Sequence, residues 1–144
     1  MIDEKRIVMM LENYERNYKE LMLIMPNTVD AYKKSVEKRR ACERVLQLLI
    51  EQCIDISNII IKEMKFGLPS EEEMIFDILA EKEVISEDLA DKLKEMKKFR
   101  NLLVHLYSKI DDQLVFENLK EHYDFLEFKK EIKEFLKEQK KKNA

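Results

Sequence analysis

The chain has 144 residues with a net charge of −3, a charged fraction of 40%, one glycine and two prolines. So little glycine disfavours a β-sandwich or barrel and excludes glycine-rich loops that bind nucleotide phosphates, while two cysteines are too few for a disulfide framework. No apolar run approaches the roughly 20 residues of a membrane span, and the N-terminus lacks the apolar core of a signal peptide. We therefore expect residues 1–144 to form one cytoplasmic, all-α domain.

Apolar residues recur at every third or fourth position through most of the chain, which predicts helices. The first helix is expected over about residues 3–23, after which Asn27 or Thr28 can cap the next helix. That second helix is expected to be long, spanning about residues 29–65, and to end before Gly67 because glycine favours the backbone conformation that terminates helices.

Serines followed by acidic residues predict the next two helix starts. Ser70 and Ser86 each precede carboxylates, so the hydroxyl can cap a helix whose positive end the carboxylates stabilise. The helix after Ser70 is short, and the helix after Ser86 extends to about residue 108. A last helix begins near Asp111 and ends in a frayed, lysine-rich tail at residues 138–144. Together these elements predict an up-and-down bundle of four long helices plus one short helix.

The spacing of potential ligands argues against a metal centre. The chain has neither the Glu-x-x-His pairs of ferritin-like sites nor Cys-x-x-Cys pairs, so we expect no metal site and no cofactor. Cys42 and Cys53 fall on one predicted helix, eleven residues or about 16 Å apart along its axis, which is too far for a disulfide. They are interpreted as buried free thiols, and His122 as a structural or solvent-facing histidine.

One segment, residues 100–107, combines a cation, an amide, an imidazole and a phenol in Arg100, Asn101, His105 and Tyr107. Arginine binds phosphate oxygens through its planar fork, and histidine transfers protons near neutral pH. On a regular helix, however, Arg100 and His105 differ by about 140° in direction. Either the helix loosens near its end, or a second subunit completes the site.

The pattern Arg-x-x-x-x-His-x-Tyr late in the chain resembles the motif of the HEPN-domain family, in its HepT branch. The segments Arg40–Gln47 and Cys53–Ile56, with Glu51 between them, also resemble the corresponding HepT helix, and the similarity covers essentially the whole chain. The resemblance implies a HEPN-like homodimer that acts as a metal-independent ribonuclease toxin, with tRNA as substrate. It also implies a minimal nucleotidyltransferase (MNT) antitoxin as partner, which adds AMP to the motif tyrosine.

Carried over to this sequence, the resemblance assigns catalysis to Arg100 and His105 and the AMP-accepting role to Tyr107. Asn101 becomes an accessory polar group. A polar stripe on the second predicted helix is formed by Arg44, Gln47, Glu51, Asp55 and Asn58. It has two interpretations: it is a solvated face with internal ion pairs, or Glu51 or Asp55 orients Arg100 or His105 across the bundle.

Two other functions remain compatible with the sequence. The chain could be a non-catalytic helical module that binds the nucleotidyltransferase, or a purely structural dimerisation bundle. The complete Arg-His-Tyr set favours the enzyme over the structural bundle, whereas only the response of RNA cleavage to loss of His105 separates the enzyme from the binding module.

Overall fold

The computed structural model describes residues 2–105 and 110–143, and every regular element in these ranges is a helix. In chain order the helices are α1 (Glu4–Ile24), α2 (Val29–Lys34), α3 (Val36–Glu63), α4 (Met74–Glu81), α5 (Glu87–His105), α6 (Asp112–Lys120) and α7 (Tyr123–Lys142). The prediction of an all-α bundle is therefore confirmed.

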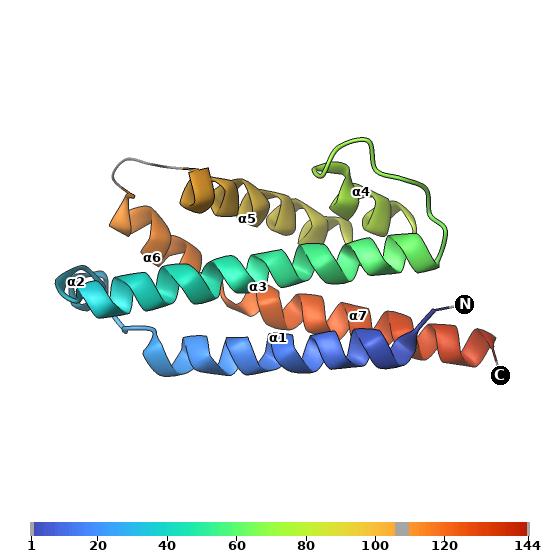
Figure 1. The fold of residues 1–144 in the computed structure, drawn as a ribbon, viewed down its shortest axis with the longest axis horizontal. Helices are drawn as coiled ribbons and strands as arrows, with labels where there is room; N and C mark the ends of the chain where they lie inside the picture. Colours follow the sequence, from blue (N-terminus) through green and yellow to red (C-terminus); the bar gives the residue numbers. More distant parts are fainter. Residues whose placement is uncertain (1, 106–109, 144) are drawn as a thin grey trace.

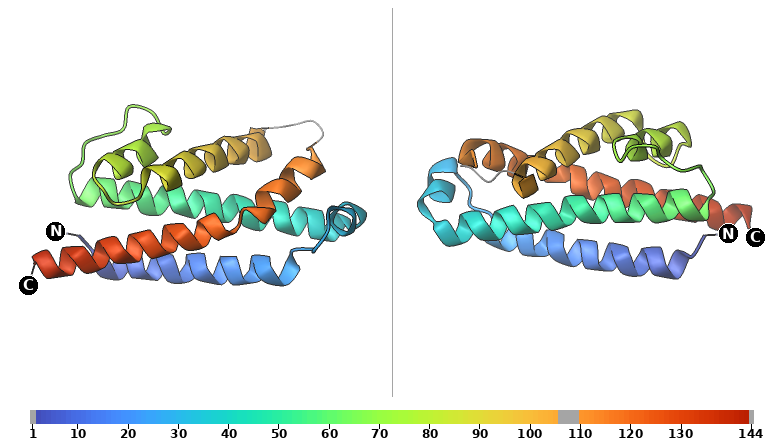
Figure 2. Two further views of the ribbon diagram at one scale, coloured as in Figure 1. Left: turned by 180° about the vertical axis from the view of Figure 1, so that it is seen from behind. Right: turned by 45° about the horizontal axis from the view of Figure 1, so that its top comes forward.

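The helix α3 is the centre of the bundle. It contacts α1 on one side and α4 and α5 on the other, and α7 packs alongside α1 (Figure 1). In both views of Figure 2, α1 lies on one side of α3 and α4 and α5 lie on the other, and α7 contacts both α1 and α5. This arrangement places α5 alongside α3.

The predicted long helix over residues 29–65 is wrong in one respect, because the chain breaks it at Ser35. Ser35 has an extended backbone, and its hydroxyl accepts the Lys38 N–H at 3.1 Å as the cap of α3. The break lets α2 turn away from α3 and bury Tyr32, whose ring centroid lies 5.9 Å from that of Phe116 in α6. Thr28 caps α2 as expected, with the Ala31 N–H at 3.1 Å.

The predicted last helix is also divided in two, at Glu121 and His122. His122 is buried at this break, where a hydrogen bond of 2.6 Å joins its Nδ1 to the Tyr18 hydroxyl and its ring lies 4.1 Å from that of Tyr123. Burial lowers the pKa of His122 because it disfavours the charged imidazolium. Of the two roles expected for His122, the structure therefore shows the structural one.

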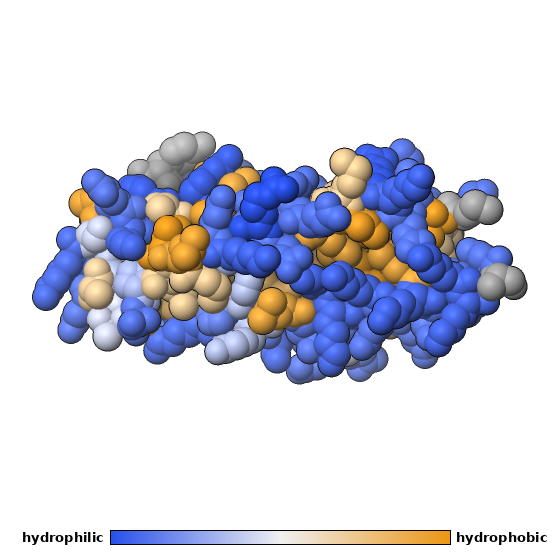
Figure 3. Space-filling model, turned by 90° about the horizontal axis from the view of Figure 1, so that it is seen from below, coloured by the Kyte–Doolittle hydropathy of each residue, from blue (hydrophilic) through white to orange (hydrophobic). Residues whose placement is uncertain are grey.

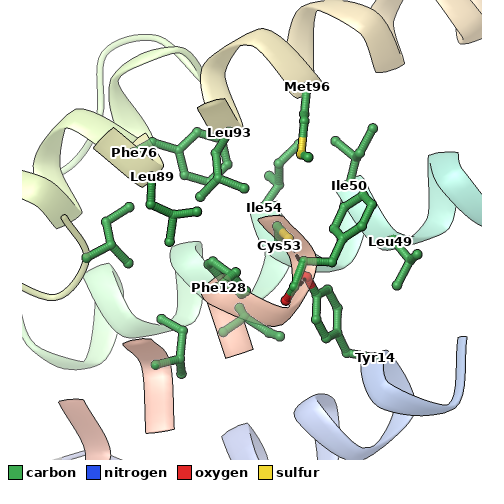
Figure 4. Packing of buried hydrophobic residues seen from close by; sticks show 14 of the residues in the cluster. Tyr14, Leu49, Ile50, Cys53, Ile54, Phe76, Leu89, Leu93, Met96 and Phe128 are labelled. Atoms are coloured by element: carbon green, nitrogen blue, oxygen red, sulfur yellow. Dashed lines mark hydrogen bonds between the residues drawn. The ribbon is translucent and has the colours of Figure 1, made fainter. Parts of the chain in front are cut away.

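The core joins α1, α3, α5 and α7 through interlocked side chains (Figure 4). The Tyr14 hydroxyl donates to the Phe125 carbonyl at 2.9 Å and accepts from the Cys53 thiol at 3.4 Å. Burial raises the pKa of Cys42 to about 11 and that of Cys53 to about 12, so both thiols stay protonated. Both cysteines are free and buried, as predicted.

The surface is largely charged. The face formed by α1 and α7 shows separate hydrophobic patches within a hydrophilic surface (Figure 3). Across α1 and α7, Lys129 pairs with Glu15 at 2.9 Å and Lys140 with Glu4 at 3.2 Å. Among the described helices, none combines the length and the apolar character needed to cross a bilayer.

Candidate active site

The helix α5 carries three of the four candidate residues of the 100–107 segment, Arg100, Asn101 and His105. It begins as predicted at Ser86, whose hydroxyl accepts the Leu89 N–H at 3.2 Å and whose own N–H donates to Glu131 at 2.6 Å. Leu93, Met96 and Phe99 bury one face of the helix. This packing positions the Arg100 side chain beside the buried face, close to α3 and α4.

Arg100 is held by a carboxylate that the sequence interpretation missed. Its Nη2 donates to Glu72 Oε1 at 2.6 Å, and the side chains of Arg100 and Glu72 are 16% and 46% exposed. Arg100 Nε is buried and, among the described residues, has no hydrogen-bond partner. Within the part of the chain that the structure describes, the guanidinium therefore has one hydrogen-bonded donor, Nη2, and one donor without a partner, Nε.

The expected cap at Ser70 is wrong, which explains why Glu72 was missed. The helix α4 begins only at Met74, with Glu73 at the N-cap position and no side-chain cap, and the Ser70 hydroxyl instead lies 3.1 Å from Met74 Sδ. Glu72 thus belongs to the connection between α3 and α4 rather than to a helix start. It lies 28 residues from Arg100 in sequence, so no local pattern could have linked the two.

The polar stripe of α3 contributes Asp55 to this environment. Burial and the neighbouring Glu51 raise the pKa of Asp55, and the Arg100 guanidinium opposes both by favouring the carboxylate. Glu51 accepts the Gln47 side-chain amide at 2.9 Å. Within the described residues, Glu72 is the carboxylate that is hydrogen-bonded to Arg100. Asp55 interacts with Arg100 only electrostatically, without a hydrogen bond.

His105 is the last described residue of α5 and is exposed. The helix is regular through Arg100, Asn101 and His105, so loosening before His105 does not bring the imidazole to the guanidinium. Asn101 lies four residues before His105 and therefore on the same face, about 40° away in direction. Tyr107 lies outside the described residues.

Apolar side chains are exposed on the same stretch of α5. Leu102 is 45% exposed and Val104 is 41% exposed, between Arg100 and His105. A hollow of about 530 Å³ between α5 and α6 includes Leu102 but neither Arg100 nor His105. Five carboxylates and two lysines line this hollow, which makes it a poor site for a polyanion.

A family model described as Ribonuclease HepT-like matches residues 14–139. The chain belongs to the HepT-like ribonuclease family. The resemblance drawn from the Arg-x-x-x-x-His-x-Tyr motif is thereby confirmed.

A curated HepT relative is the mRNA nuclease HepT of Shewanella oneidensis. It is 36% identical over 84 residues, which span 58% of this chain and 63% of that protein. The aligned part thus covers less than two thirds of the relative's length.

Several solved structures share the fold. The tri-AMPylated HEPN toxin of Shewanella oneidensis, in complex with its MNT antitoxin, has a TM-score of 0.82 and 28% identity, covering 92% of this chain and 98% of that one. YutE of Bacillus subtilis, a cytosolic protein of unknown function, has a TM-score of 0.82 and 27% identity, with 96% and 93% covered. A toxin–antitoxin complex with AMP-PNP has a TM-score of 0.80 and 27% identity, with 88% and 96% covered.

Proposed function

We propose that this protein is the ribonuclease toxin of a toxin–antitoxin pair, acting on RNA in the cytoplasm as a homodimer. Its membership of the HepT-like family supports the activity, and the complexes named for its structural relatives support the pairing. The observation that carries the proposal is the placement of Arg100 and His105 on one unbroken helix, with the imidazole exposed.

In this proposal, a second copy of the chain completes the active site. Because Arg100 and His105 point in directions about 140° apart, one chain cannot aim both at the same phosphate. Two copies related by a two-fold axis would bring two arginines and two histidines to a shared groove. The exposed Leu102 and Val104 lie between these residues and supply the apolar surface that such a contact buries.

The chemistry of this groove is phosphoryl transfer within the RNA chain. The 2′-hydroxyl oxygen attacks the adjacent phosphorus as neutral His105 of one copy takes its proton, and the bond to the 5′ oxygen breaks as protonated His105 of the other copy donates a proton to it. Arg100 stabilises the negative charge on the phosphorus centre. The products are a 2′,3′-cyclic phosphate and a free 5′-hydroxyl, and no step requires a metal ion.

Three further residues play accessory roles in the proposal. Asn101 lies one turn before His105 and can bind the sugar or phosphate there. Asp55 helps to keep the guanidinium in place through its charge, and the neighbouring Glu51 adds negative charge on the same part of α3.

Incubating the purified protein with total RNA and excess EDTA tests the activity and its metal independence. We expect cleavage to persist and to leave 2′,3′-cyclic phosphate ends, which enzymatic end-labelling detects. Sequencing the new ends separates tRNA, the substrate implied by the family resemblance, from mRNA, the substrate in the name of the Shewanella relative.

Two outcomes would contradict this assignment. Cleavage that stops in EDTA and returns with Mg²⁺ would show metal-dependent chemistry. Protein that binds a nucleotidyltransferase but leaves all RNA intact would instead be a non-catalytic binding module.

We further propose that an MNT-type antitoxin inactivates the protein by adding AMP to Tyr107. The Shewanella toxin that shares this fold is named as tri-AMPylated in its complex with an MNT antitoxin. An AMP group adds a negative phosphodiester two residues from His105, where it would compete with RNA phosphate for the site's cations.

Intact-mass measurement after incubation with the antitoxin and ATP tests this modification. We expect a gain of about 329 Da for each AMP. Tyr107→Phe should abolish the gain, whereas Tyr123→Phe, which removes an exposed tyrosine of α7, should leave it intact. A gain that survives Tyr107→Phe would place the modification elsewhere.

A further inference from the structure

The contact between Glu72 and Arg100 uses only one of the two adjacent donors with which a guanidinium binds a carboxylate or phosphate. The Nε–H and one Nη2–H of a guanidinium point to the same side and together hold two oxygens of a carboxylate or phosphate. In Arg100, Nη2 holds Glu72 Oε1 at 2.6 Å, while Nε is buried with no hydrogen-bond partner among the described residues. Glu72 therefore binds one of these two donors and leaves the other unsatisfied.

A phosphate cannot reach this edge while Glu72 remains in place. Only 16% of the Arg100 side chain is exposed, and the Glu72 carboxylate lies over the donor that a phosphate oxygen would use. Glu71 and Glu73 flank Glu72, so the same segment carries three adjacent carboxylates that repel a polyanion.

The segment that carries Glu72 can move at small cost. Residues 70–74 are exposed, and Leu68 is almost fully exposed, so displacing the segment uncovers little apolar surface. Its backbone is irregular, with a positive φ of 104° at Gly67, and α4 begins without a side-chain cap. The contact with Arg100 joins this segment to the catalytic helix.

We propose that Glu72 is an intramolecular competitor of the RNA phosphate for Arg100. This inference rests on the proposed ribonuclease function. While Glu72 is bonded to Arg100, the segment between α3 and α4 holds the guanidinium and screens its charge. RNA binding then requires release of Glu72, after which one phosphate can take both Nη2 and Nε, so the contact limits activity until substrate displaces it.

Binding of RNA to His105→Ala protein, which does not cleave it, tests the competition. We expect Glu72→Gln in this background to bind a short single-stranded RNA about two- to fivefold more tightly, the range expected for loss of one exposed ion pair. Glu71→Gln is the matched control, because it removes the same charge from the adjacent residue. It should strengthen binding less, as only long-range repulsion changes.

Reactivity of Arg100 provides a measurement that does not depend on RNA. Phenylglyoxal modifies accessible arginines, and peptide mass spectrometry gives the rate at Arg100 relative to Arg40, an exposed arginine near the start of α3. Glu72→Gln should speed modification of Arg100 by about the same two- to fivefold factor, and Glu71→Gln should not.

The two measurements separate the possible failures. Equal effects of Glu72→Gln and Glu71→Gln on both RNA affinity and Arg100 reactivity would overturn the proposed competition. Weaker RNA binding by Glu72→Gln would also overturn it, and would show that Glu72 positions Arg100 for RNA. If no variant binds RNA but Glu72→Gln still speeds modification, the contact masks Arg100 and the proposed function fails.

Discussion

Replacing His105 by alanine is expected to lower the rate of RNA cleavage by about 10²- to 10⁴-fold, because the variant lacks the group that transfers protons in both steps. Arg100→Ala should lower it by about 10²- to 10³-fold through loss of charge stabilisation at phosphorus. Initial rates on a labelled RNA, in EDTA, measure both effects. Arg40→Ala is the matched control, since it also removes an arginine paired with a glutamate but lies near the start of α3 rather than on α5, and its rate should stay near wild type.

His105→Ala also decides whether two copies share the active site. When wild-type and His105→Ala chains are co-expressed in equal amounts and form dimers at random, a site that needs both imidazoles leaves about a quarter of the activity. A site contained within one chain leaves about half. Activity proportional to the fraction of wild-type chains would therefore contradict the shared groove, even if His105 proved essential.

Phe128→Ala should destabilise the fold by about 3–5 kcal/mol, the usual cost of removing a fully buried phenylalanine. Phe128 of α7 is inaccessible to solvent and lies 5.8 Å, centroid to centroid, from the Tyr14 ring of α1 (Figure 4). Its removal would leave a cavity where α7 meets α1 and α3. Urea unfolding followed by circular dichroism gives the change in the free energy of unfolding.

Leu126→Ala provides the control for this substitution. Leu126 lies two residues away on the same helix but is 41% exposed, so its loss should cost about 1 kcal/mol or less. Similar losses for both variants would mean that Phe128 does not lie in the core beside Tyr14.

Local chemistry in the sequence accounts for most of the secondary structure. Thr28 and Ser86 cap helices where their hydroxyls precede acidic residues and apolar repeats, and both caps form. The breaks at Ser35 and His122 were not predictable in the same way. Neither site has glycine or proline, and each break is stabilised by a partner distant in sequence: Phe116 packs with Tyr32 beyond one break, and Tyr18 bonds to His122 at the other.

For the candidate site too, the sequence determined some features and the tertiary structure determined others. The motif Arg-x-x-x-x-His-x-Tyr is contiguous in the chain, so the sequence alone identified the family and named Arg100, His105 and Tyr107 as its functional candidates. The environment of Arg100 was decided by tertiary structure, because Glu72 and Asp55 reach it from a connecting segment and from another helix. Spacing along a chain determines which residues share a helix face, whereas only packing determines which charges from different helices meet.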